Sequence, residues 1–213
     1  MKKALSIIAL TLIVIIISCG NNQNKENESN DNIIFIDNFD GKETIPNTEI
    51  WQLCTHFNVE WAQHFKHVEG YENVRVEQGH LVLKGSKDGE HYKNGGIRSK
   101  IGFPCNTRLE VKARLNKKVR GAFPAIWQMP MNGEQWPLSG EIDLMEWVQG
   151  TPNMIYQTLH TQYIKDQTGH TGATNPNPNK EFDVTKDHVY AAERTENSII
   201  FYVDGKETWR YNK

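Results

Sequence analysis

The chain has 213 residues, of which 38% are hydrophobic and 23% are charged, a composition typical of one globular domain rather than of a disordered or fibrous chain. Its formal net charge is −2, so it lacks the basic excess that nucleic-acid binding requires. We therefore expect no nucleic-acid partner.

Residues 1–19 have the pattern of an export signal. Lys2 and Lys3 precede a largely apolar run that ends at Ile17, and this order is typical of a secretory leader. The run is shorter than the ~20 residues of a membrane-spanning helix. It ends in Ser18-Cys19, which resembles the bacterial lipobox, whose cysteine is acylated; a plain signal peptide with a chance cysteine is the alternative. We expect Cys19 to carry a lipid that anchors the exported chain to the cell envelope, at the outer membrane or cell surface.

The next segment, 20–32, is almost wholly Asn, Gln, Glu, Lys and Ser, and such a composition cannot bury a core. We interpret it as a flexible linker that leads into one domain, 33–213. Cys54 and Cys105 remain in that domain, and in an exported chain they could form a disulfide or stay free. The sequence leaves both alternatives open.

From residue 33 onward, short alternating segments separated by turn residues predict strands with one buried face. The expected strands are Ile34–Ile36, His80–Lys84, Gly96–Ser99, Arg108–Leu115, Ala125–Gln128, Glu141–Val148, Met154–His160, Val189–Glu193, Ile199–Val203 and Lys206–Tyr211. Asp204-Gly205 suits the tight turn of a hairpin. With no long amphipathic helix, the pattern predicts an all-β sandwich of two antiparallel sheets. Lys165–Lys180, rich in Asn, Pro and Gly, is expected to be a long surface loop.

Three carboxylates lie close together in the segment Glu141-Ile142-Asp143-Leu144-Met145-Glu146. In a regular strand Glu141 and Asp143 share a face, whereas Glu146 falls on the apolar face. Burying that charge costs several kcal/mol unless it is paired or protonated. A bulge at Leu144-Met145 inserts one extra residue and returns Glu146 to the face of the other two acids. The sequence therefore predicts a bulged strand with three acids on one surface.

Two carboxyl groups on one surface suit glycoside hydrolysis, in which one attacks the anomeric carbon and a protonated one donates to the departing oxygen. Like charges held close raise one pKa and supply the protonated acid. A solvated acidic edge and a calcium site are the alternatives. Trp136 before the acids and Trp147 after them favour sugar binding, because sugar rings stack on aromatic faces.

The segment Gly140–Glu146 resembles the active-site strand of family 16 glycoside hydrolases, in the bulged form Glu-x-Asp-x-x-Glu. Further matching segments lie at Trp51, Gly95–Lys100, Arg108–Ala113, Gly121–Trp127, Trp136-Pro137 and Ile200–Gly205. The resemblance implies a jelly-roll sandwich of the concanavalin A-like lectin and glucanase type, with a substrate groove on its concave sheet. It also implies Glu141 as nucleophile, Asp143 as the residue that orients it and Glu146 as acid/base.

The resemblance also implies substrate-binding residues. Trp136 becomes a candidate for sugar stacking, although on chemistry alone Trp136 and Trp127 could equally be core aromatics. A histidine on the strand after the catalytic one would be His160, near the leaving group, and Arg98 is a further candidate. No cofactor and no metal are expected, and we expect a monomer.

The bulged motif is similar to that of laminarinases, agarases and carrageenases, which makes endo-hydrolysis of a β-1,3(4)-glucan the leading expectation. A β-galactan or a β-galactose-containing glycan is the alternative, and a non-cleaving carbohydrate-binding lipoprotein is a second one; a purely structural envelope protein would explain neither acids nor aromatics. Glu193-Arg194 departs from the Glu-Trp of many relatives, replacing an aromatic surface with a cation. Relatives continue past the final hairpin, so the sandwich is expected to be incomplete, with unpaired sheet edges.

Overall fold

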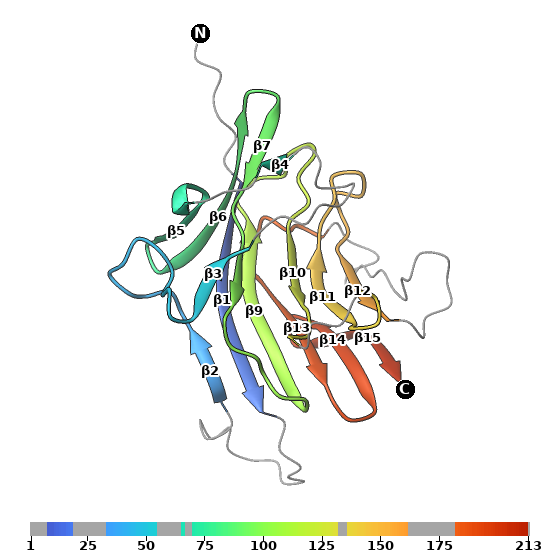
Figure 1. Ribbon diagram of the computed structural model, residues 1–213. Helices are drawn as coiled ribbons and strands as arrows, with labels where there is room; N and C mark the ends of the chain where they lie inside the picture. Colours follow the sequence, from blue (N-terminus) through green and yellow to red (C-terminus); the bar gives the residue numbers. More distant parts are fainter. Residues whose placement is uncertain are drawn as a thin grey trace.

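The computed structural model describes residues 8–18, 33–54, 65–66, 70–131, 136–161 and 182–212, of which 8–18 and 65–66 are described by their backbone alone. Strands dominate these residues, joined by one short 3-10 turn, η3 (Tyr71–Asn73) (Figure 1). The strands are β1 (Ile8–Ser18), β2 (Ile33–Asp37), β3 (Trp51–Leu53), β4 (Phe65–Lys66), β5 (Val74–Glu77), β6 (His80–Asp88), β7 (His91–Asn94), β8 (Ile97–Ser99), β9 (Thr107–Leu115), β10 (Ala125–Gln128), β11 (Glu141–Glu146), β12 (Tyr156–His160), β13 (His188–Arg194), β14 (Ser198–Val203) and β15 (Lys206–Asn212). No helix among the described residues is long and apolar enough to cross a membrane.

The strands build an antiparallel jelly-roll sandwich, as expected. The larger sheet has ten strands, with β15-β14-β13-β9-β1-β6-β7-β4 as its path, while β2 pairs with β1 and β5 with β6. A three-stranded sheet, β10-β11-β12, lies over the β13–β15 part of the larger sheet, and β3-β8 form a separate pair (Figure 1). Within the described residues, β10, β12 and β15 each pair on one side only.

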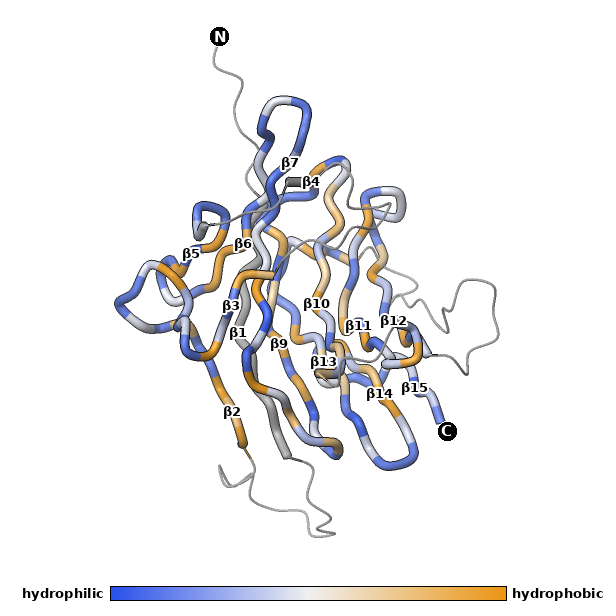
Figure 2. Tube along the Cα trace, viewed as in Figure 1, coloured by the Kyte–Doolittle hydropathy of each residue, from blue (hydrophilic) through white to orange (hydrophobic). Residues whose placement is uncertain are grey.

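The core lies between the layers. Along β9, hydrophobic and charged residues alternate (Figure 2), and Val111, Ala113 and Leu115 are buried. Leu144 and Met145 of the smaller sheet are also fully buried. Alternate residues of a strand face opposite sides of the sheet, so the charged residues of β9 point away from this core. The sandwich thus supports β11 from behind with close-packed apolar side chains.

Strand β1 occupies the place between β9 and β6, pairing antiparallel with both. Its residues are those that the sequence assigns to the export leader. A run rich in β-branched Ile and Val favours a strand. This arrangement belongs to the uncleaved chain, because processing before Cys19 would remove β1. The leader therefore stays a prediction.

Most of the expected strands are confirmed, including Ala125–Gln128 with the same bounds. The hairpin turn is also confirmed, with φ of 50° at Asp204 and 75° at Gly205. The strands β3, β5 and β7 were not predicted, since each has at most four residues and too little periodicity. Among the described residues, no disulfide joins Cys54 and Cys105. The whole of the expected loop Lys165–Lys180 lies outside the described residues.

Candidate active site

Strand β11 carries the predicted bulge. On the β10 side, Asp143 pairs with Trp127 and Met145 with Ile126, so Leu144 is skipped. On the β12 side, Asp143 pairs with Thr158 and Glu146 with Tyr156. The two residues Leu144 and Met145 therefore lie opposite the single residue Gln157. Two residues opposite one is the definition of a bulge. The extra residue restores Glu146 to the face of Glu141 and Asp143, as predicted.

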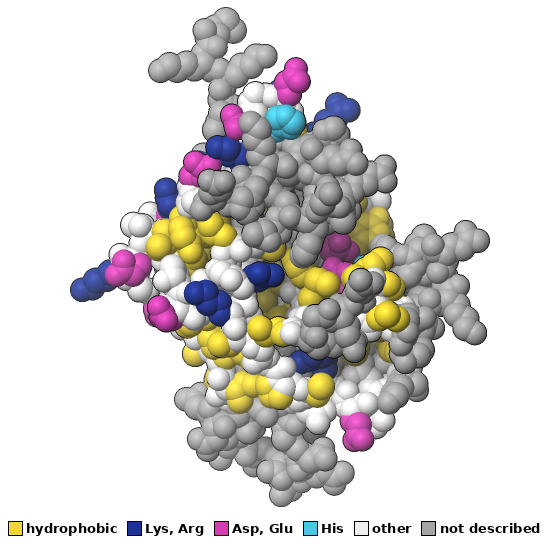
Figure 3. Space-filling model, viewed as in Figure 1, with side chains coloured by type: hydrophobic (Ala, Val, Ile, Leu, Met, Phe, Trp, Pro, Cys, Tyr) yellow, Lys and Arg dark blue, Asp and Glu magenta, His cyan; other side chains and the backbone are white. Residues whose placement is uncertain are grey.

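The three acids differ in how far they are buried. Asp143 is only 2% exposed, whereas Glu141 and Glu146 at the two ends of the strand are partly exposed. Acidic atoms reach the surface among apolar side chains over β11 and β12 (Figure 3). A surface of this kind weakens water screening of the carboxylates, so that each acid affects the protonation of its neighbours.

Glu141 is held by the tryptophan that precedes the strand. The Trp136 indole N–H donates a hydrogen bond to Glu141 Oε2 at 2.7 Å. The turn between them closes with a bond from Gly140 N–H to the Pro137 carbonyl, and the φ of 79° at Gly140 favours glycine. Burial and the charge of Asp143 raise the pKa of Glu141, while the indole bond opposes that rise. Trp136 therefore favours the charged form of Glu141.

Asp143 lies between the acids and faces a histidine of the next strand. His160 Nε2 is 3.4 Å from Asp143 Oδ2, and His160 pairs across the ladder with Glu141. The Asp143 carboxylate raises the pKa of His160. The ring centroids of His160 and Trp136 are 5.5 Å apart. Asp143 and His160 thus form a pair of opposite charge beneath Glu141 when the histidine is protonated.

Glu146 is the carboxyl group with the higher tendency to keep its proton. Burial, followed by the charge of Asp143, raises its pKa to about 7. Thr158, on β12, donates a hydrogen bond to Glu146 Oε2 at 3.2 Å and opposes part of this rise. A carboxyl group with a pKa near neutrality can act as a general acid in neutral solution.

The structure places the other candidate residues as follows. Trp127 is half-buried and lies directly opposite Asp143, on the acid-bearing face. Trp136, 51% exposed, also lies at the acids. Arg98 is exposed on β8 and pairs with Gln52; its charge acts on Cys54, whose pKa burial raises. The structure therefore brings Trp127 and Trp136 to the acids, as it does His160, but leaves Arg98 on another pair of strands.

One expectation about this region is wrong. Trp147 is fully buried, and its indole N–H donates to the Pro152 carbonyl at 3.2 Å, so it is a core residue and does not stack on sugar. Arg194, the cation that replaces the tryptophan of many relatives, has a structural contact. Its guanidinium donates to the carbonyls of Phe103 and Pro104, at 3.2 and 2.7 Å, and so holds a loop.

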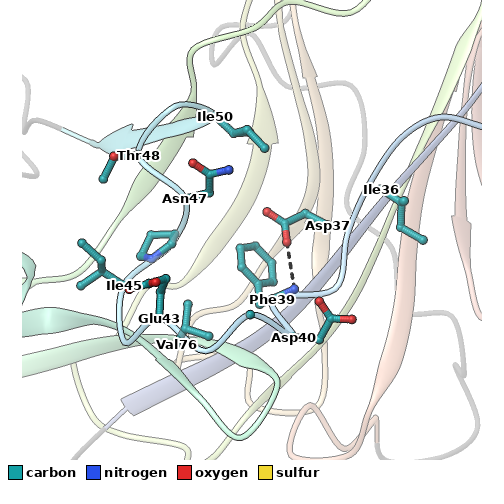
Figure 4. Close-up of a pocket in the computed structure, with 12 residues that line it drawn as sticks. Ile36, Asp37, Phe39, Asp40, Glu43, Ile45, Asn47, Thr48, Ile50 and Val76 are labelled. Atoms are coloured by element: carbon teal, nitrogen blue, oxygen red, sulfur yellow. Dashed lines mark hydrogen bonds between the residues drawn. The ribbon is translucent and has the colours of Figure 1, made fainter.

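A pocket with a volume of about 590 Å³ lies away from the acids, under the loop that follows β2 (Figure 4). Its carboxylate Asp37 accepts bonds from the Phe39 amide at 2.8 Å and the Trp51 indole at 2.7 Å. Both oxygens are thus used to shape the loop. In the part of the chain that is described, no three His, Cys, Asp or Glu side chains are grouped to hold a metal ion.

Sequence reasoning missed the polar residues of β12. Thr158 bonds Glu146, and Gln157, one residue earlier, is fully buried opposite the bulge. A signal was present, because Gln157 falls at a position that strand alternation directs into the core. Buried polar side chains need partners, so such a position indicates a specific contact.

Comparisons with known proteins agree with this geometry. A family model described as "Glycosyl hydrolases family 16" matches residues 61–213. The "Beta-glucanase" of Rhodothermus marinus is 33% identical over 150 residues, which are 66% of this chain and 51% of that protein. The "Keratan-sulfate endo-1,4-beta-galactosidase" of Sphingobacterium multivorum is 27% identical over 188 residues, 84% of this chain and 43% of that protein. The chain thus spans about half the length of these curated relatives.

A solved structure is more similar. It is described in the words "Prominent members of the human gut microbiota express endo-acting O-glycanases to initiate mucin breakdown", and it is 63% identical to this chain. The TM-score is 0.78, and the match covers 85% of this chain and 76% of that one. With a family model that matches most of its length and an acid strand of the expected form, the chain belongs to glycosyl hydrolase family 16.

Proposed function

We propose that this protein is a retaining, endo-acting glycoside hydrolase that cleaves β-linked polysaccharide by double displacement. The observation that carries the proposal is the β11 bulge, which places Glu141, Asp143 and Glu146 on one face. Burial and the charge of Asp143 raise the pKa of both glutamates, but the indole hydrogen bond opposes this rise at Glu141, whereas the pKa of Glu146 reaches about 7. Glu146 is therefore the better proton donor of the two.

In the first step, Glu141 attacks the anomeric carbon. The bond from that carbon to the glycosidic oxygen breaks, its electron pair moves to the oxygen, and Glu146 gives its proton to that oxygen. The product is a glycosyl ester of Glu141 and a released chain end. The hydrogen bond from the Trp136 indole to Oε2 of Glu141 orients the attacking carboxylate.

In the second step, the ionised Glu146 takes a proton from water while the water oxygen attacks the same carbon. The ester bond breaks, Glu141 leaves as a carboxylate, and Glu146 is again protonated. Asp143 fixes the position of Glu141, and burial together with the charge of Asp143 keeps the pKa of Glu146 high. Two displacements at one carbon retain its configuration.

The substrate is the finer part of the proposal. The beta-glucanase of Rhodothermus marinus supports a β-glucan, and a β-1,3(4)-glucan stays the lead. A glycan with β-galactosidic bonds is the second candidate, since the 63% identical structure comes from work on O-glycanases that initiate mucin breakdown and a keratan-sulfate galactosidase matches 84% of the chain. The 63% identity to that structure is far above the 33% identity to the glucanase. Mucin-type O-glycans therefore belong in the first substrate panel together with laminarin.

The test is reducing-end release from laminarin, mixed-linkage glucan, agarose, keratan sulfate and mucin O-glycans. Glu141→Gln is the matched control, because it keeps the shape and the indole contact but cannot attack. Activity on one glycan that the variant lacks supports the hydrolase and identifies its substrate. Equal release by both proteins would sink the catalytic proposal; binding of a glycan without release by either would favour the non-cleaving carbohydrate-binding protein.

We also propose that the mature protein is a monomer anchored in the bacterial cell envelope through a lipid on Cys19. The order of basic, apolar and small residues before Cys19 supports the anchor. Labelling of expressing cells with an alkyne fatty acid is expected to tag the wild type but not Cys19→Ala. Equal labelling of both would contradict the anchor.

A further inference from the structure

We infer that Gln157, bound to Thr208, is a positioning residue that holds the β11 bulge and thereby the separation of the two catalytic glutamates. This inference rests on the proposed function, because it assigns Gln157 a part in the same site. Gln157 touches no substrate position itself; it acts through the backbone of Leu144.

The contacts of Gln157 reach three strands. Its side-chain amide donates to the Leu144 carbonyl at 3.0 Å and to the Tyr202 carbonyl at 3.3 Å, and its side-chain oxygen accepts from the Thr208 hydroxyl. Leu144 lies in β11, Tyr202 in β14 and Thr208 in β15. The side chain is fully buried. Gln157 therefore connects the catalytic strand to the hairpin in the opposite layer.

Because the bulge interrupts strand pairing at Leu144, the Leu144 carbonyl needs the hydrogen bond from the Gln157 amide. Leu144 is the residue that β10 skips, and neither Leu144 nor Met145 has a paired residue on β12. A buried carbonyl without a donor costs about 1–3 kcal/mol, and both residues are fully buried. The Gln157 amide supplies a donor at the place where the ladder is interrupted. Without this hydrogen bond, the bulged form of β11 has a smaller free-energy advantage over a regular strand.

A regular strand would move the acids. Removing the extra residue shifts the alternation by one and turns Glu146 away from Glu141. Thr158, which bonds Glu146, adjoins Gln157 in β12, so both contacts depend on the same short segment. Gln157 is thus placed to control the geometry of Glu146 through the backbone on either side of it.

The test uses two nearly isosteric variants of the full chain. Gln157→Met removes the amide at similar volume, and Thr208→Val removes the hydroxyl that holds it. Each is expected to lower kcat by roughly 10- to 100-fold, because small misplacement of a catalytic group costs about that much, with KM changed by less than about threefold. Thr208→Ser keeps the hydroxyl and is expected to restore turnover. Tyr190→Phe is the matched control. It removes a buried hydroxyl that, unlike the hydroxyl of Thr208, has no hydrogen-bond partner among the described residues.

A second readout needs no substrate. Carbon-13 NMR titration of the Glu146 carboxyl is expected to give a midpoint near 7 in the wild type and a lower one in Gln157→Met, since a displaced Glu146 escapes burial and Asp143. Wild-type kcat and midpoint in both variants, with only a lower Tm, would overturn the inference. A wild type inactive on every glycan would refute the proposed function, while the titration would still decide the role of Gln157. If Gln157→Met does not fold, Thr208→Val decides by the same two readouts.

Discussion

Replacing Glu146 by glutamine is expected to stabilise the protein above neutral pH while abolishing turnover. In the folded state the pKa of Glu146 is raised from 4.5 to about 7. The unfolded chain therefore releases this proton at lower pH than the folded chain, so folding stability falls as pH rises between these two values. Glutamine has no proton to lose and avoids the loss.

The magnitude follows from the same numbers. The two pKa values differ by about 2.5, and each unit corresponds to about 1.4 kcal/mol, which gives an upper bound of ~3.4 kcal/mol. Glu146 is partly exposed, so solvent reduces the effect by about half, to roughly 1–2 kcal/mol. For a domain of this size that gain raises Tm by about 2–8 °C.

Urea unfolding of wild type and Glu146→Gln at pH 4 and pH 8 measures the effect. We expect similar free energies of unfolding at pH 4, where both states of the wild type keep the proton, and the gain at pH 8 alone. Gln accepts the Thr158 bond as Glu does, which makes the pair well matched. A difference that is the same at both pH values would refute the reasoning, and so would a variant less stable at pH 8.

Three further outcomes are expected. The profile of kcat/KM against pH should be bell-shaped, with an alkaline midpoint near 7 from Glu146 and an acid midpoint above 4.5 from Glu141; a flat alkaline side would contradict the assignment. Trp136→Phe removes the indole donor but keeps an aromatic ring, so the acid midpoint should rise and kcat/KM should fall by roughly tenfold; an unmoved acid midpoint would show that the bond is not needed. Arg194→Met should lower the free energy of unfolding by about 1–3 kcal/mol through two lost carbonyl bonds, leaving the pH profile unchanged; a shifted profile would place this residue at the substrate.

The bulge was predictable from the sequence because regular strand alternation conflicts with the position of Glu146. Strict alternation buries Glu146 among apolar residues, and one extra residue resolves that conflict at a small local cost. The hairpin at Asp204-Gly205 was predictable for a similar reason, since few residues accept positive φ. Local rules that leave few alternatives were therefore sufficient for the acid strand and its face.

The contacts of single side chains were less predictable. Trp147 directly follows Glu146, so parity along the strand already directs it to the core face, and nearness to the acids was the wrong criterion. Arg194 bonds carbonyls that lie 90 and 91 residues earlier in the chain, and the position of that loop depends on tertiary packing. The same holds for Gln157 and Thr208, which are 51 residues apart. Residue type and spacing do not encode such long-range partners.

The 51-residue separation of Gln157 and Thr208 in the sequence affects the order in which the active site forms during folding. The bulge lies within the six-residue strand β11. The Thr208 hydroxyl that holds Gln157 belongs to the β14–β15 hairpin, 51 residues after Gln157 in the sequence. Contacts between distant residues form after local ones, because the intervening loop must first be closed. The catalytic geometry is therefore expected to mature late in folding, after β10, β11 and β12 have paired, when docking of β14 and β15 sets the spacing of the acids. If the chain is exported as proposed, it would become able to cleave only once the β14–β15 hairpin has crossed the membrane.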